Sequence, residues 1–128
     1  MAITLDTHTL SWYLEGSNSK LSEKALKAIK EAERDDIIYI SIIVLMELLH
    51  LIEKGRINLS FKKIISLIEE NDHYNVVDFN MELLDIVEEL KGLEAHDRII
   101  LATAILTESA LISKDKEIRN YQGINIIW

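Results

Sequence analysis

Short runs of β-branched and aromatic residues alternate along the chain with longer segments of helical periodicity, and this alternation restricts the fold more than any other feature. We expect strands at residues 2–6, 37–40, 75–79, 110–113 and 125–128, and helices at residues 7–14, 23–34, 42–54, 61–70, 81–91 and 98–107. Alternation of this kind is typical of a parallel sheet covered by helices. The sequence therefore predicts an α/β fold, a three-layer α/β/α sandwich with a mostly parallel sheet of roughly five strands.

Polar residues and glycines mark where several of these helices begin and end. Ser22, Ser60 and Asn80 precede helical segments and are residue types that cap a helix N-terminus. Gly55 and Gly92 follow helical segments, as glycine commonly does after a helix C-terminus. The chain has no proline and no low-complexity stretch, so we expect residues 1–128 to form a single domain.

The composition predicts a folded intracellular protein. Apolar residues make up 48% of the 128 residues, which is enough to build a core without disulfides. The chain has no cysteine, so thiolate metal sites are excluded and a reducing cytoplasm is the expected location. The first residues lack the basic region of a signal peptide, and the longest apolar run is far too short to cross a membrane.

The formal charge of −8 is unusual for a protein that binds nucleic acid, because such proteins usually carry a basic surface. Two interpretations are open. In one, the acidic residues keep the surface solvated. In the other, some of them cluster where cations have to bind before a phosphate can approach. Composition does not separate these two interpretations, so the positions of the acids have to decide.

Two of the acids come at the ends of predicted strands. Asp6 ends the first strand, and Asp115 follows the fourth. The carboxyl ends of parallel strands meet at one edge of a sheet, which is where ligands bind in such folds. Each residue also has a structural interpretation, since Asp6 suits a helix N-cap and Asp115 suits a turn.

Two further acids belong to helices. Glu47 is surrounded by apolar residues in a segment that we expect to be buried on most faces, where an isolated carboxylate is costly. Its structural alternative is a partner one or two turns away, His50 or Lys54. Asp97 precedes the apolar helix at 98–107 and taken alone is more simply a helix N-cap.

The four acids together predict a metal site. Carboxylate oxygens suit hard cations such as Mg²⁺ or Mn²⁺, which bridge to phosphate oxygens and lower the pKa of a bound water. Mg²⁺ keeps several of its waters, so four acids fit either two metals or one metal with supporting acids. A site of this kind repels phosphate until cations fill it, which partly reconciles the net charge with a nucleic-acid substrate.

Five segments of the chain resemble a known family. They are residues 5–8 (LDTH), 44–51 (VLMELLHL), 53–57 (EKGRI), 96–104 (HDRIILATA) and 111–115 (LISKD). Their order and spacing resemble those of PIN domains, and most closely the VapC-type ribonuclease toxins of toxin–antitoxin pairs. The resemblance extends over essentially the whole chain.

The resemblance implies a Mg²⁺- or Mn²⁺-dependent endoribonuclease in which water activated by the metal attacks phosphorus and leaves a 5′-phosphate and a 3′-hydroxyl. By residue match, the acids at the metal are Asp6, Glu47, Asp97 and Asp115. Thr7 supports Asp6 by a hydrogen bond in this interpretation. The implied partners are an RNA substrate, a small VapB-like antitoxin and a second copy of the chain in a homodimer.

Other polar and aromatic residues have weaker signals. Arg98, Lys114 and Lys116 lie beside the candidate acids and could contact phosphates, or could be solvated charges. An accessory role is open for His8 and His96, which also neighbour these acids. The aromatic residues Trp12, Tyr13 and Trp128 are interpreted as core or interface residues rather than as platforms for bases.

Three other functions remain as alternatives. The chain could be a stand-alone PIN ribonuclease in RNA processing, without an antitoxin. It could be a non-catalytic PIN-like module that binds proteins, although such a module has no need for a buried Glu47. A phospho-receiver domain shares the layered architecture but requires adjacent acids after the first strand, where this chain has only Asp6.

Overall fold

A single parallel sheet organises the molecule. The computed structural model describes residues 1–128. The strands lie in the order β3-β2-β1-β4-β5, and every neighbouring pair is parallel. Their bounds are β1 Ile3–Leu5, β2 Ile38–Ser41, β3 Tyr74–Val77, β4 Ala110–Ile112 and β5 Ile126–Ile127. The predicted parallel five-stranded sheet is confirmed.

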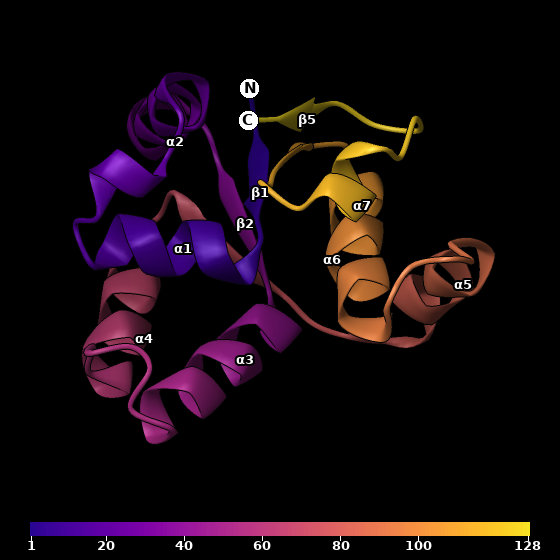
Figure 1. Ribbon diagram of the computed structural model, residues 1–128. Helices are drawn as coiled ribbons and strands as arrows, with labels where there is room; N and C mark the ends of the chain where they lie inside the picture. Colours follow the sequence, from indigo (N-terminus) through magenta and orange to yellow (C-terminus); the bar gives the residue numbers. More distant parts are fainter.

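Helices cover both faces of this sheet. They are α1 Thr7–Leu14, α2 Glu23–Asp35, α3 Ile42–Glu53, α4 Phe61–Glu70, α5 Met81–Glu89, α6 Ala95–Leu106 and α7 Lys116–Arg119, with a short 3₁₀ helix at Asn18–Lys20. Figure 1 shows α1 and α2 on one side of β1 and β2, and α5 and α6 on the other. The α/β/α sandwich predicted from the sequence is therefore confirmed.

The strand order reverses next to β1. From β1 the chain moves outward to β2 and β3, and it then returns to β4 on the opposite side of β1. Leu5 is in register with Ile112, so these two strands end side by side. A crevice forms at such a point because the connections that follow the two strands diverge.

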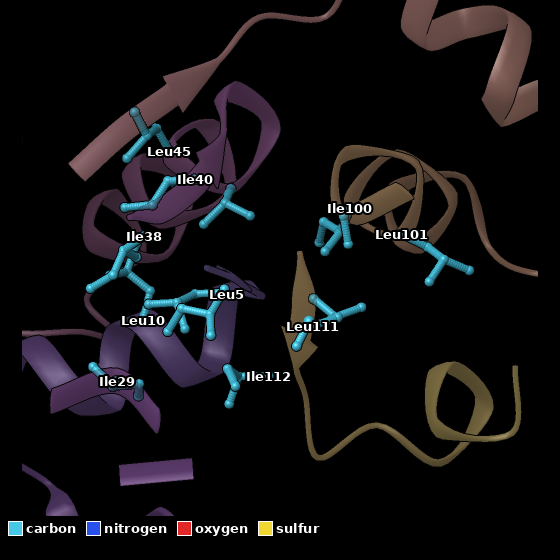
Figure 2. Close-up of a cluster of buried hydrophobic side chains, with 14 of the residues drawn as sticks. Leu5, Leu10, Ile29, Ile38, Ile40, Leu45, Ile100, Leu101, Leu111 and Ile112 are labelled. Carbon is cyan, nitrogen blue, oxygen red and sulfur yellow. The ribbon is translucent and has the colours of Figure 1, made fainter. Parts of the chain in front are cut away.

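The residues of β1, the central strand of the sheet, are fully buried. Ile3, Thr4 and Leu5 are all buried, as expected for a parallel strand that is covered on both faces. The Thr4 hydroxyl is satisfied by Ser109 Oγ at 2.6 Å. Figure 2 shows part of the surrounding core, where side chains of α1, α2 and α6 meet those of the strands.

The predicted helix caps are present. Ser22, Ser60 and Asn80 each accept a backbone N–H of the first turn of α2, α4 and α5. Gly55 ends α3 with a φ of +72°, a conformation that glycine adopts without strain. Its N–H donates to Ile52 O, and the N–H of the next residue, Arg56, donates to Leu51 O.

Some boundaries differ from the sequence prediction. β3 is Tyr74–Val77 rather than 75–79, because its pairing with Ile38–Ser41 sets its length. α6 starts at Ala95, so Asp97 lies inside the first turn and is not its N-cap. Asp115, whose structural alternative was a turn residue, is instead the N-cap of the short helix α7.

α3 is less buried than its apolar sequence predicts. Val44, Leu45 and Leu48 are buried, but Ile42 and Met46 are 40% and 55% exposed. One face of the helix packs on the core while another meets solvent. None of the helices combines the length and the apolar character that crossing a lipid bilayer requires.

Truncating a core side chain of α6 should destabilise the fold strongly. Leu101 is fully buried, so Leu101→Ala should lower the free energy of unfolding by about 3 kcal/mol. Leu67→Ala is the matched control, because Leu67 is 42% exposed and should cost less than about 1 kcal/mol. Urea unfolding measures both variants, and equal losses would contradict this description of the core.

Candidate active site

A cavity of about 530 Å³ opens at the edge of the sheet where β1 and β4 end. Its acidic lining comes from four different segments and consists of Asp6, Glu47, Glu94, Asp97 and Asp115. Thr7, His8, Trp12 and Lys114 complete its polar and aromatic walls. The structure therefore brings all four of the predicted acids to one cavity, which we call the acidic cleft.

Asp6 follows β1 directly and is only 7% exposed. Its backbone N–H continues the ladder by donating to Ile112 O at 3.4 Å. Its Oδ1 accepts the Thr9 N–H at 2.9 Å, so Asp6 caps α1 while it also faces the cleft. The two interpretations of Asp6 are thus compatible, because one carboxylate oxygen caps the helix and the other stays free.

Glu47 is held in place from two sides. The Thr7 hydroxyl donates to Glu47 Oε1 at 2.9 Å, and His96 Nδ1 lies 3.6 Å from Oε2. The sequence instead assigned Thr7 to Asp6, and it considered His50 or Lys54 as a partner of Glu47. The Thr7 hydroxyl binds Glu47 and not Asp6, and the contacts of Glu47 come from α1 and α6, which only the fold brings to α3.

Asp97 is the most strongly perturbed acid. Burial, followed by the negative charges of Asp115, Glu94, Glu47 and Asp6, raises its pKa to about 6. No positive side chain is among these causes, so ionising Asp97 adds charge to an already negative cavity. A raised carboxyl pKa of this kind in a cleft is characteristic of functional sites.

Asp115 lies where β4 passes into α7. Its Oδ1 accepts the N–H groups of Glu117 at 2.8 Å and Ile118 at 3.3 Å, which makes it the N-cap of that helix. Its own N–H donates to the buried hydroxyl of Ser113 at 3.1 Å. As with Asp6, the cap fixes the carboxylate and leaves one oxygen toward the cleft.

Sequence reasoning missed Glu94 and underestimated the aromatic wall. Glu94 precedes α6 without capping it, and it lies three residues before Asp97, a spacing that places both on one side of the helix start. Trp12 stacks on His8 with ring centroids 5.7 Å apart, and Lys114 Nζ lies 5.9 Å from its ring centroid. The tryptophan therefore borders the cleft rather than lying wholly in the core.

The structure places Arg98 away from the cleft. Its Nη2 donates to Val87 O at 2.7 Å and to Glu88 O at 3.3 Å, and its Nε also reaches Val87 O. These carbonyls end α5, so the guanidinium joins α5 to α6. The predicted contact between Arg98 and phosphate is not supported by this placement, whereas Lys114 does line the cleft.

The cleft suits a hard cation without enclosing one in advance. All the candidate ligands are carboxylate oxygens, and their mutual repulsion raises the pKa of Asp97. No three acidic or histidine side chains lie close enough to form a complete cage. Mg²⁺ takes only one or two carboxylates directly and keeps its waters, so these residues fit it in this arrangement.

Comparison with known proteins identifies the family. The fold and the cleft define an α/β protein with an acidic site at the switch point of a parallel sheet. The PIN domain family model matches residues 3–124. The chain therefore belongs to the PIN domain family, as the sequence motifs suggested. No curated protein matches its sequence.

Solved structures share this fold at low sequence identity. VapBC2 from Rickettsia felis, bound to a DNA fragment from its promoter, matches with a TM-score of 0.72 and 18% identity over 98% of this chain and 97% of that chain. A toxin–antitoxin complex from Klebsiella pneumoniae matches at 0.68 and 20% identity over 95% and 94% of the two chains. VapBC-1 from nontypeable Haemophilus influenzae matches at 0.67 and 16% identity over 98% and 96%.

Neutralising Asp97 should stabilise the metal-free protein above pH 6. The folded state holds a proton on Asp97 up to about pH 6, whereas the unfolded chain releases it near 3.8. The contribution of Asp97 to the free energy of unfolding is therefore fully present at low pH and is lost as the pH rises from 3.8 to about 6. Asp97 is only half-buried, so solvent screens part of the repulsion. We therefore expect Asp97→Asn to raise the free energy of unfolding by about 1 kcal/mol and the Tm by roughly 3–5 °C.

Thermal unfolding in EDTA between pH 4 and pH 8 measures this effect. The advantage of Asp97→Asn over wild type should be small near pH 4 and should reach a plateau above pH 6. Asp78→Asn is the control, because Asp78 is exposed and lies outside the cleft. An advantage that does not change with pH would contradict the raised pKa.

Proposed function

We propose that this chain is a Mg²⁺- or Mn²⁺-dependent endoribonuclease and the toxin of a type II toxin–antitoxin pair. The observation that carries the proposal is the convergence of Asp6, Glu47, Asp97 and Asp115 on one cleft at the switch point of the sheet. PIN domains are generally nucleases, and the structural neighbours are toxin–antitoxin complexes. These findings support hydrolysis of a phosphodiester over protein binding alone.

Different contacts position each of the acids that would bind a cation. Asp6 and Asp115 are fixed by the N–H groups of α1 and α7, so each presents one oxygen in a defined position. Thr7 orients Glu47, and a bound cation would lower the raised pKa of Asp97 by offsetting the negative charges around it. A bound divalent cation would lower the pKa of water and neutralise the charge that develops on the phosphate.

The remaining residues of the cleft act on the substrate. Lys114 offers a positive charge to a phosphate that enters beside Asp115. In the proposed reaction, water attacks phosphorus in line and loses its proton to solvent. The bond to the 3′ oxygen breaks on the opposite side of phosphorus, and this oxygen takes a proton from solvent, which leaves a 3′-hydroxyl and a 5′-phosphate. The walls formed by Trp12 and Ile118 limit the directions from which water enters.

The partners are also part of the proposal. A VapB-like antitoxin is the expected inhibitor, since the neighbours with this fold occur in toxin–antitoxin complexes. A homodimer is supported by exposed apolar side chains at the start of α5, where Phe79, Met81 and Leu84 are at least 41% exposed. We place the active protein in the cytoplasm as a single PIN domain.

Metal-dependent cleavage of RNA is the direct test. Purified protein should cut total RNA with Mg²⁺ or Mn²⁺ and should lose this activity in EDTA. Asp97→Asn should slow cleavage by about 100-fold or more, whereas Asp78→Asn should cut at the wild-type rate. Equal cleavage by wild type and Asp97→Asn would refute the assignment. Absence of both cleavage and metal binding would favour the non-catalytic module.

Removing the Thr7 hydroxyl should weaken metal binding through Glu47. Thr7→Val keeps the shape of this buried residue but leaves Glu47 Oε1 without its donor. We expect about a tenfold loss of Mn²⁺ affinity by calorimetry, while Thr7→Ser should bind as wild type does. Loss of affinity in both variants, or in neither, would contradict the positioning role of Thr7.

A further inference from the structure

A second cavity, of about 450 Å³, lies beside the acidic cleft between α1 and α3. Thr7, His8 and Glu47 line both cavities, so the two adjoin each other. Away from these shared residues the lining has no further acid. It consists of the apolar side chains Ile43, Met46 and Leu51, the histidines His50 and His96, and one arginine, Arg56. We call this second cavity the α1–α3 groove.

Arg56 is held in position by the turn that ends α3. The Gly55 N–H donates to Ile52 O, and the Arg56 N–H donates to Leu51 O, both at 3.0 Å. This pair of hydrogen bonds folds the chain back along the helix, so Arg56 lies beside Leu51 in the wall of the groove. The positive φ of Gly55 is what permits the turn.

The Arg56 guanidinium is free to bind an anion. It takes part in no ion pair and donates no side-chain hydrogen bond within the chain. In contrast, Arg34 pairs with Asp35, and Arg98 is bound to backbone carbonyls. His50 lies three residues after Glu47 and therefore on the same side of α3, about one helical turn away.

We propose that the α1–α3 groove is a phosphate-binding subsite for single-stranded RNA, in which Arg56 and His50 contact a backbone phosphate next to the one at the acids. The inference rests on the proposed nuclease function, because it assigns a path to the same substrate. A strand that leaves the acidic cleft over His8 enters this groove directly. In a chain of charge −8, a free arginine at that position offsets the repulsion of the backbone.

The geometry favours RNA over an acidic protein segment as the occupant. The groove adjoins the cleft where a phosphodiester would react, and an extended polyanion has to occupy several such positions at once. Arg56 also offers planar paired donors that match phosphate oxygens. An acidic peptide would use the same charge without any need for the adjoining acids.

RNA binding to cleavage-deficient protein tests the subsite. A labelled pool of mixed-sequence single-stranded RNA is titrated with Asp97→Asn in Mg²⁺ at several salt concentrations. Adding Arg56→Gln should weaken binding about three- to tenfold and should lower the slope of log affinity against log salt by about 0.7, the value for one phosphate contact. Arg56→Lys should restore most of the slope.

The control variant is Arg34→Gln on the same Asp97→Asn background. Arg34 is an exposed arginine at the end of α2, and it lies outside both cavities. It should change neither affinity nor slope. His50→Gln should weaken binding less than Arg56→Gln does, because a histidine lacks the paired donors of a guanidinium.

The outcomes separate the subsite from the nuclease assignment. If wild type cleaves RNA but Arg56→Gln binds RNA like Arg34→Gln, the proposed subsite is refuted and the proposed nuclease function is retained. If wild type fails to cleave RNA but Arg56→Gln lowers the slope of log affinity against log salt, the proposed nuclease function is refuted and the groove still binds RNA. Binding of poly-L-glutamate through Arg56, with no RNA effect, would overturn the proposal in favour of an acidic protein partner.

Discussion

The parallel pairing of β1 with β4 is the constraint on which the rest of the structure depends. It places a buried strand between two neighbours and brings Leu5 into register with Ile112. Because the chain leaves these two strands in different directions, a crevice forms beyond their ends. Asp6 and Asp115 enter that crevice from its two sides, and any shift in the register would separate them.

The carboxylates around that crevice repel one another. Five carboxylates line one cavity, and Lys114 is the only cationic side chain of Lys or Arg type in its wall. Local contacts offset part of this repulsion. Backbone N–H groups donate to Asp6 and Asp115, the Thr7 hydroxyl donates to Glu47, and His96 lies within ion-pair distance of Glu47. Asp97 has no comparable donor, and its pKa is raised by burial and by the repulsion that remains. A divalent cation is the ligand that relieves this repulsion most directly.

Local residue chemistry was enough to predict most of the elements and the four acids. Caps such as Ser22 and Asn80 act within one turn of their own helix, so their effects are visible in the sequence. The partners of the acids were not predictable in this way. Thr7 meets a glutamate 40 residues away, and Arg98 binds carbonyls of the preceding helix instead of lining the cleft. These contacts depend on helix packing, which has no local signal.

The sequence by itself determined the layered α/β architecture, because the strand and helix periods and the capping residues are properties of short segments. It also determined which carboxylates follow strands or lie in an apolar helix. Only the tertiary structure decided that Asp97 belongs to a first turn, that Glu94 joins the acids, and that Arg56 lines a groove next to their cleft. Those features arise where segments distant in the chain are packed together, and hydrophobic burial of the sheet sets that packing.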